Sequence, residues 1–243
     1  MQQLVESEHR IPDGYRQGPY ELEVFRSASN IPQHCWGGII DLLNEIIATN
    51  WRIDTPWWSP SDTPFREGYG IAFVRHDDQI VGFTIWRRLV VNDRPTISRS
   101  GIELRPEHQG KGLFGLLLKG VLDAELSSVL EGDEVYYSWR TRNPVAWSAH
   151  AKVCTRLLPS LVDGNDDGSL QDVALQIANT LYPDRALELP NMVIRNSYPN
   201  ITYHRQPSYE TNGALTEKFR RLIPDTADAI FTVGTIRKSG SAA

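Results

Sequence analysis

The sequence predicts an α+β fold, and two observations carry this prediction. First, the segments 70–76, 79–93 and 94–105 are apolar or alternating, and only the turn signals "DD" and "NDRP" separate them. Short polar separations of this kind are typical of a meander of antiparallel strands. Second, a glycine-rich loop after residue 104 opens an amphipathic helix and leads to another strand, which indicates one strand–loop–helix–strand crossover.

The elements before the meander are predicted from their periodicity. Residues 20–26 (YELEVFR) alternate apolar and polar side chains, as a half-buried strand does. Ser29 or Asn30 can then cap a helix that has Pro32 in its first turn. Residues 50–70 are rich in Pro, Ser, Asp and Trp and predict a long loop. The apolar face of the helix between them is formed by Trp36, Ile39, Ile40, Leu43, Ile46 and Ile47.

The elements after the meander follow from the same reasoning. We expect a helix over 112–126, a strand over 134–140, and a helix from 144 to about 156. A further helix is expected over 170–181 and a closing strand over 228–236. The apolar face of the helix that follows the glycine loop includes Leu113, Leu116, Leu117 and Leu126.

The length of 243 residues suits one large domain or a domain with a sizeable appendage. We expect a polar N-terminal segment over 1–19 and a core over 20–160. A C-terminal extension over 161–238 would end in the closing strand, and 239–243 (SGSAA) would form a loose tail.

The composition is that of a soluble globular protein, with 40% hydrophobic and 23% charged residues. The net charge is -5 and no long basic block occurs, so nucleic-acid binding is not expected. The N-terminus lacks the apolar core of a signal peptide, and no apolar stretch approaches the ~20 residues that span a bilayer. Cys35 and Cys154 have no metal-ligand spacing and form no disulfide framework. We therefore expect a cytoplasmic protein without a membrane partner or a metal.

Gly110, Gly112 and Gly115 match the spacing G-x-G-x-x-G of a dinucleotide-binding loop. Such a loop directly follows a buried apolar strand in a parallel sheet, whereas five residues separate Leu104 from Gly110 here. The preceding strand is polar around Arg99, and several antiparallel strands come before it. The loop does not match the Walker motif either, because no Gly-Lys-Ser/Thr is present. A phosphate remains the expected ligand, since glycines expose backbone amides and a helix N-terminus carries partial positive charge.

The segment Gln109-Gly110-Lys111-Gly112 between a strand and an amphipathic helix resembles the acyl-CoA-binding segment of the GNAT superfamily of N-acyltransferases. That pattern is Gln or Arg, two residues, Gly, one residue, then Gly or Ala. Gln109 and Gly112 match it, and Phe114 departs from it. A second family segment has Asn, two residues, Ala, three residues, then Tyr. Asn143, Ala146 and His150 take those places, so a histidine stands where the family has a tyrosine.

The resemblance covers about 20–160 and implies a GNAT-like mixed, mostly antiparallel sheet flanked by helices. It also implies a cofactor, acetyl-CoA or another acyl-CoA, whose phosphates are held by main-chain amides. The residues that it implies for the cofactor are Ile102, Leu104, Gln109, Gly110, Lys111, Gly112, Leu113, Phe114 and Asn143. Ile102 and Leu104 are expected to point their side chains into the core and to offer backbone groups to the pantetheine arm.

Other side chains have a functional and a structural interpretation. His150 takes the place of a tyrosine that protonates the departing thiolate, or it packs against the sheet. Asn143 caps a helix in either case. Trp57 and Trp58 lie in the loop where such enzymes form the acceptor pocket, or they cover the edge of the core. Trp139 and Trp147 flank the expected cofactor site, although core packing is favoured for at least one of them.

Two further patterns give no assignment. "DGNDDG" (163–168) imitates half a calcium loop but has Ala174 where a bidentate glutamate is required, so an acidic turn before the next helix is favoured. The candidates for a general base are Asp54, Glu67, His76 and Glu103, and strand alternation makes Glu103 a surface or helix-facing charge.

The resemblance implies an acyltransferase that moves an acyl group, by preference acetyl, from acyl-CoA to the amine of a small molecule. Within the fold, a longer acyl chain, a carrier-protein donor or decarboxylation of the thioester stays open. A non-catalytic acyl-CoA-binding regulatory module and a homodimer also stay open.

Overall fold

The computed structural model describes residues 15–162, 164–207 and 212–238. The first part of the predicted N-terminal segment, Asp163 of the acidic turn and the predicted tail lie outside the described residues. The chain forms two compact units. The first comprises residues up to 50, 55–87 and 100–127, and the second comprises 51–54, 88–99 and the residues from 128 onwards. The predicted boundary at residue 160 stays a prediction.

The first unit holds the antiparallel strands of the predicted meander. Its strand order is β1-β2-β4-β5-β6. The turn between β4 and β5 consists of Asp77 and Asp78, both with positive φ, which is the geometry of a tight hairpin turn. The strands are β1 (Arg16–Gln17), β2 (Tyr20–Phe25), β4 (Tyr69–His76), β5 (Gln79–Val91) and β6 (Arg94–Leu104), of which residues 88–91 of β5 and 94–99 of β6 belong to the second unit.

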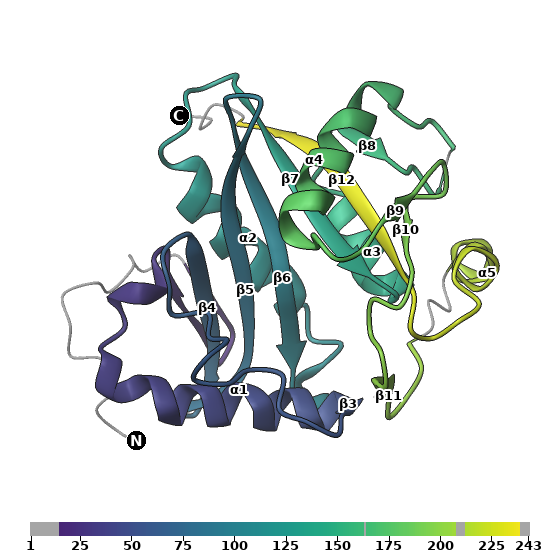
Figure 1. The fold of residues 1–243 in the computed structure, drawn as a ribbon. Coiled ribbons are helices and arrows are strands. Elements are labelled where there is room, and N and C mark those ends of the chain that lie inside the picture. The colour runs from purple at the N-terminus through teal and green to yellow at the C-terminus, as the bar shows by residue number, and fades with distance from the viewer. Residues whose placement is uncertain (1–14, 163, 208–211, 239–243) are drawn as a thin grey trace. The chain divides into compact units, whose positions relative to one another are not determined.

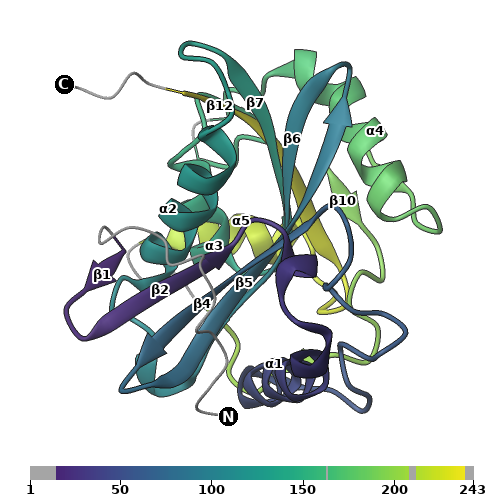
Figure 2. The same ribbon diagram turned by 90° about the vertical axis from the view of Figure 1, so that its left-hand side faces the viewer.

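Two helices cover opposite faces of these strands (Figures 1 and 2). Helix α1 (Trp36–Asn50) buries the apolar face that the sequence predicts, from Ile39 to Ile47. Helix α2 (Leu113–Leu126) packs against β2 and β4. A Cβ added at Gly120 would lie 2.3 Å from the Leu22 side chain, so this glycine allows α2 to approach β2 closely.

The second unit continues the mixed sheet. The first half of β6 pairs in parallel with β7 (Glu134–Thr141), from Thr96 opposite Tyr136 to Arg99 opposite Trp139. Strand β12 (Ala229–Arg237) lies antiparallel to β7 and also pairs with two short strands. The remaining strands of this unit are β3 (Trp51–Arg52), β8 (Arg156–Leu158), β9 (Leu187–Glu188), β10 (Val193–Ile194) and β11 (Thr202–Tyr203).

Alternation along β12 separates the two helical layers of the second unit. Phe231 and Val233 join the core beneath α4 (Gln171–Leu181). Thr232, between them, accepts a hydrogen bond from the indole nitrogen of Trp147 in α3 (Pro144–Ala151) at 3.0 Å. Figures 1 and 2 accordingly show α3 and α4 on opposite faces of β7 and β12. Helix α5 (Gly213–Leu222) buries Leu215 and Phe219.

The α+β fold is confirmed, with five α-helices in the described ranges, and two predicted boundaries are wrong. The first helix begins at Trp36, because Pro32 has an extended ψ of 134° and precedes a 3-10 turn, Gln33–Cys35. A second such turn, Ala28–Asn30, comes before it. The helix expected to reach about 156 ends at Ala151, and Arg156 begins β8. Helix α5 and the two-residue strands were not predicted.

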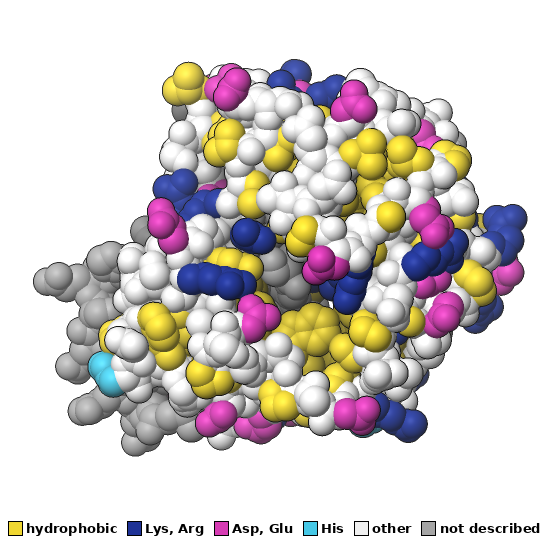
Figure 3. Space-filling model, in the orientation of Figure 1, with side chains coloured by type: hydrophobic (Ala, Val, Ile, Leu, Met, Phe, Trp, Pro, Cys, Tyr) yellow, Lys and Arg dark blue, Asp and Glu magenta, His cyan; other side chains and the backbone are white. Residues whose placement is uncertain are grey.

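The surface mixes charges of both signs. On the face that Figure 3 shows, Lys and Arg side chains alternate with Asp and Glu and form no continuous basic patch. Among the described residues, no helix is both long enough and apolar enough to cross a membrane.

Candidate functional site

The glycine loop follows β6 in the first unit and begins with a 3-10 turn, Pro106–His108. Gly110 and Gly112 have φ of +74° and +77°, in the left-handed region, and α2 starts directly after Gly112. Gly115 donates its N–H back to the Gly112 carbonyl, but the N–H groups at the very start of a helix have no intrahelical acceptor. Left-handed residues of this kind aim successive amides at one point, which makes the loop a candidate nest for an anion.

The space around the loop backbone differs between the two glycines. A Cβ added at Gly110 would meet no atom of the described residues within 4 Å. At Gly112 it would lie 2.8 Å from Nε2 of Gln17, which donates to the Lys111 carbonyl at 2.7 Å. The backbone at Gly110 is therefore open, whereas Gly112 is held against β1.

A chain of side-chain amides ties the loop to the end of α1. Gln109 donates through Nε2 to Oδ1 of Asn50 at 2.8 Å and to the Leu104 carbonyl at 3.0 Å. Asn50 in turn donates to the same carbonyl at 2.9 Å and to the Glu103 carboxylate at 2.8 Å. Glu103 thus faces the end of a helix, as predicted, and the Gln109 side chain is engaged within the protein.

The strand residues expected to serve the pantetheine arm lie at the end of β6. Ile102 and Leu104 are both half-buried, so neither side chain is fully enclosed, and the expectation that they point into the core stays a prediction. Both acceptor directions of the Leu104 carbonyl are used by Asn50 and Gln109. Backbone bonding to a pantetheine arm stays a prediction, and this carbonyl is not available for it.

Positive charge and an uncharged histidine flank the loop. Lys111 is exposed, and its ammonium lies 5.8 Å from the centre of the Tyr20 ring. The Tyr20 hydroxyl is 3.1 Å from Nδ1 of His108. The pKa of His108 is lowered by partial burial and then by the charge of Lys111, so the imidazole is neutral at neutral pH. The positive charge beside the loop therefore comes from Lys111, and this charge favours the binding of an anion.

The two tryptophans of the long loop differ in burial. Trp58 is 7% exposed, and its backbone exchanges two hydrogen bonds with the Asn44 side chain of α1, at 2.9 and 2.8 Å. Trp57 is half-buried. Trp58 thus covers the core edge, while the predicted role of either residue in acceptor binding stays a prediction.

In the second unit, Asn143 is the N-cap of α3. Its Oδ1 accepts from the N–H groups of Val145 and Ala146 at 2.9 and 3.2 Å. The capping role is confirmed, and contact with a cofactor stays a prediction. Trp139 and Trp147 are 0% and 1% exposed, so both belong to the core of this unit.

His150 shares one buried face of α3 with Ala146 and Trp147, as the spacing predicts. Its side chain is fully buried, and its Nδ1 lies 2.5 Å from the Tyr137 hydroxyl. Burial, and secondarily the charge of Arg99, holds the pKa of His150 well below its usual value. The role as a general acid stays a prediction, and burial disfavours the protonated imidazole that such a role requires.

The candidate bases are scattered. In the first unit Glu67 is exposed and His76 pairs with Asp77 at 3.2 Å, while Asp54 of the second unit is exposed. Within the described ranges, no group of three or more His, Cys, Asp or Glu side chains could hold a metal ion. Asp167 of the acidic turn accepts from the Ser169 N–H at 3.0 Å and so caps the turn before α4.

No protein-family model and no curated protein matches the sequence. Solved structures do match it. They are GNAT N-acetyltransferases. The ribosomal-protein-S18-alanine N-acetyltransferase from Escherichia coli is 14% identical, with a TM-score of 0.46 over 91% of this chain and 98% of that chain. A putative GNAT-family acetyltransferase from Desulfovibrio desulfuricans is 12% identical, with a TM-score of 0.39 over 90% and 99%. The GNAT domain of S. lividans PAT is 9% identical, with a TM-score of 0.42 over 60% and 86%.

Low identities and TM-scores below 0.5 confine this similarity to the fold, so neither activity nor substrate follows from it. The parallel β6–β7 pair and the helix that starts at the glycine loop agree with the GNAT-like fold predicted from the sequence. Sequence reasoning missed Asn50 and Gln17, which hold the loop, because their partners are up to 94 residues away along the chain.

Proposed function

We propose that this protein is an acyl-CoA-dependent N-acyltransferase whose glycine loop binds the pyrophosphate of acyl-CoA. The observation that carries the proposal is the backbone of Gly110 and Gly112, left-handed at both residues and placed directly before α2. Backbone amides at a helix N-terminus suit a phosphate without any side-chain charge.

The residues of the first unit fit such a ligand. The backbone at Gly110 is open, so a phosphate can approach the main chain there. Gln109 is tied to Asn50 and Leu104, which leaves the main chain, and not the Gln109 side chain, as the donor. The exposed Lys111 adds an ammonium group beside the loop.

Bound acyl-CoA supplies a thioester whose acyl carbon is open to attack by a neutral amine. The protein's contribution at the loop is to hold the phosphates in a fixed place, which removes rotational and translational freedom before the reaction. The anchoring of the loop by Asn50 and Gln17 serves this purpose, because it fixes the amides without using them. Acetyl as the acyl group and a small-molecule amine as the acceptor are part of the proposal.

The test is a pair of measurements on the same protein. Acetyl-CoA should raise the melting temperature, as a ligand of the native state does, and NAD and NADP should not. Release of free thiol should then be followed over a panel of small amines. A shift with NAD and none with coenzyme A would overturn the phosphate assignment. Binding of acetyl-CoA without turnover on any amine would leave a regulatory acyl-CoA-binding module instead of an enzyme.

A further inference from the structure

Two arginines at the end of β7, in the second unit, are buried without a carboxylate partner. Arg142 is 4% exposed and Arg140 is half-buried. Other arginines of this unit pair with acids: Arg156, for example, bonds Glu134 at 2.9 Å and Asp167 at 3.2 Å. Within the described ranges, neither Arg140 nor Arg142 has an Asp or Glu oxygen at ion-pair distance, although unpaired buried charges are costly.

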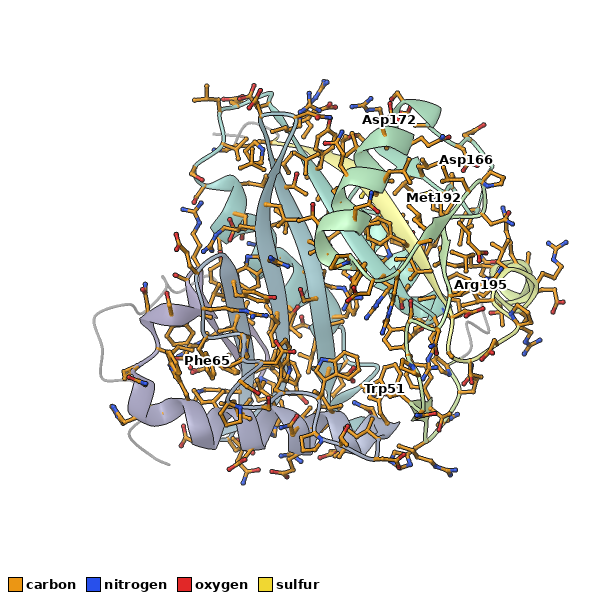
Figure 4. The ribbon with its side chains drawn as sticks, viewed as in Figure 1. Trp51, Phe65, Asp166, Asp172, Met192 and Arg195 are labelled. Carbon is orange, nitrogen blue, oxygen red and sulfur yellow. The ribbon has the colours of Figure 1, made fainter. Side chains whose placement is uncertain are left out.

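Aromatic rings surround the two guanidinium groups in place of acids. The central carbon of Arg142 lies 4.8 Å from the ring centres of both Trp51 and Tyr203. The central carbon of Arg140 lies 4.7 Å from the ring of Tyr198, which is also 5.0 Å from Arg142. Trp51 is labelled in Figure 4. Ring faces attract a cation but accept no strong hydrogen bonds from its N–H groups.

Several N–H donors in this cluster therefore stay unused. Arg142 donates through Nη2 to the Ile201 carbonyl at 2.7 Å, but its Nε and Nη1 have no acceptor among the described residues. The same holds for Nε of Arg140 and of Arg99, a neighbour that donates to the Arg140 carbonyl at 3.4 Å. A buried donor without an acceptor costs free energy, which a ligand with oxygen atoms would recover.

The surrounding charges leave the cluster positive. Arg185 adds a further cation, whose pKa is lowered by burial and by Arg140. The pKa of Arg142 is also lowered, chiefly by burial, which a hydrogen bond to Tyr203 opposes. The pKa of Arg140 is raised despite its burial, because Tyr182 and Tyr198 favour its charged form. The carboxylates that act on these groups are Asp225, on Arg142, and Asp184, on Arg185, and neither forms an ion pair with them in the described part of the chain.

We propose that Arg99, Arg140 and Arg142 form a binding site for an oxyanion, either a carboxylate or a phosphate group of a small molecule. The guanidinium fork matches both groups, and the unused donors supply the hydrogen bonds that such a ligand needs. The site lies wholly in the second unit and does not depend on the proposed acyl transfer.

The experiment is calorimetric titration of the whole chain with phosphate and, separately, with malonate, at constant ionic strength maintained with potassium chloride. At least one of the two anions should bind the wild type. The anion that binds more tightly shows whether the site prefers a phosphate or a carboxylate group. Arg142→Met keeps an unbranched apolar stem but is shorter, and it removes the guanidinium group with its charge and its N–H donors. We expect it to weaken binding at least ~10-fold, the loss of about one charged hydrogen bond.

Arg220→Gln is the matched control, because Arg220 lies in the same unit and is exposed on α5. It should bind the anion like the wild type. If Arg142→Met does not fold, Arg140→Lys takes its place, since lysine keeps the charge but loses the planar fork. No binding by the wild type, or equal binding by wild type and cluster variants, overturns the proposal.

Glu210 lies outside the described residues, and its substitution tests whether the chain supplies the anion itself. Under the proposal, Glu210→Gln leaves the affinity for the anion and the stability unchanged. If Glu210→Gln lowers the melting temperature and strengthens anion binding by tenfold or more, the glutamate is the partner of the cluster and the ligand site is refuted. Gly112→Asp, which alters the other unit, should leave this binding intact and so separates it from coenzyme A binding.

Discussion

Gln109 donates its side-chain amide to Asn50 across 2.8 Å and so joins the start of the glycine loop to the last residue of α1. Asn50 uses its own amide to hold Glu103 and Leu104 at the end of β6. One asparagine thus holds a helix, a strand and a loop together, and the loop owes its position to a residue outside the glycine motif.

The first prediction concerns Asn50. Asn50→Ala should lower the free energy of unfolding by about 1–3 kcal/mol, because it removes the hydrogen bonds that Asn50 makes with Gln109, Glu103 and the Leu104 carbonyl. It should also weaken acetyl-CoA binding, because the loop loses its anchor. Urea unfolding and calorimetry check the two effects. Asn30→Ala, at an exposed position, is the control, and equal stability of both variants would show that the anchor is not needed.

The second prediction concerns Gly112. Gly112→Asp should abolish acetyl-CoA binding, since it adds a negative charge beside the loop amides and puts a Cβ against Gln17, which holds the loop. The left-handed φ should cost about 1 kcal/mol of stability, which the fold can survive. Gly168→Asp is the matched control, because Gly168 is exposed with open space around it. Circular dichroism shows whether the variant is folded, and calorimetry on the same sample measures its acetyl-CoA binding. If the variant still binds acetyl-CoA with micromolar affinity, the loop is a structural turn and not the phosphate site.

The third prediction concerns His150 and pH. Its folded pKa lies below the unfolded value near 6.5, so the unfolded chain takes up the proton more readily. The contribution of neutral His150 to stability is therefore complete above about pH 6.5 and is lost as the pH falls. In that range the free energy of unfolding should decrease by about 1.4 kcal/mol per pH unit. Unfolding free energies between pH 5 and 7 measure this slope.

The double variant His150→Phe, Tyr137→Phe should lose that slope, because it removes the titrating group together with its hydroxyl partner. Tyr137→Phe alone keeps the histidine and should retain the slope. Identical slopes in both variants would mean that other groups titrate. In turnover, His150→Phe should leave any ionisation near neutrality in the pH–rate profile unchanged, whereas its loss would support the general-acid role.

The fourth prediction separates Trp57 from Trp58. Trp58→Ala should cost about 3–5 kcal/mol of stability, because Trp58 is buried against α1. Trp57→Ala, at the half-buried position, should cost much less. If Trp57 lines the acceptor pocket, its loss should raise the KM of the amine more than that of acetyl-CoA. If Trp57→Ala changes the KM values of the amine and of acetyl-CoA equally, Trp57 has a structural role and does not line the acceptor pocket.

The sequence predicted the elements whose periodicity is long and regular. The apolar spacing from Ile39 to Ile47 gave α1, and the turn signals gave the hairpins, because Asp77 and Asp78 adopt positive φ with little strain. Helix α5 was missed, although Asn212 caps it by accepting from the Leu215 N–H at 3.0 Å. Its two buried positions, Leu215 and Phe219, are too few for a periodic pattern.

The candidate site was predictable only in its local part. The glycines and Asn143 could be read from spacing, since a left-handed loop and an N-cap are local structures. The anchoring by Asn50 and the arginine cluster depend on residues that meet only in the folded chain. The spacing left two interpretations of His150 open, because α3 is too short to show whether the face that carries it packs against the sheet or meets a ligand.

The position of β12 has a consequence for the synthesis of the protein. This strand is the last element that the structure describes, yet it lies between β7 and β10, with eight of its nine residues buried. The first unit is complete once residue 127 has left the ribosome, and it can fold while translation continues. The second unit must wait for residues 229–237, and until then β7 presents an open edge to which chaperones or a neighbouring nascent chain can bind.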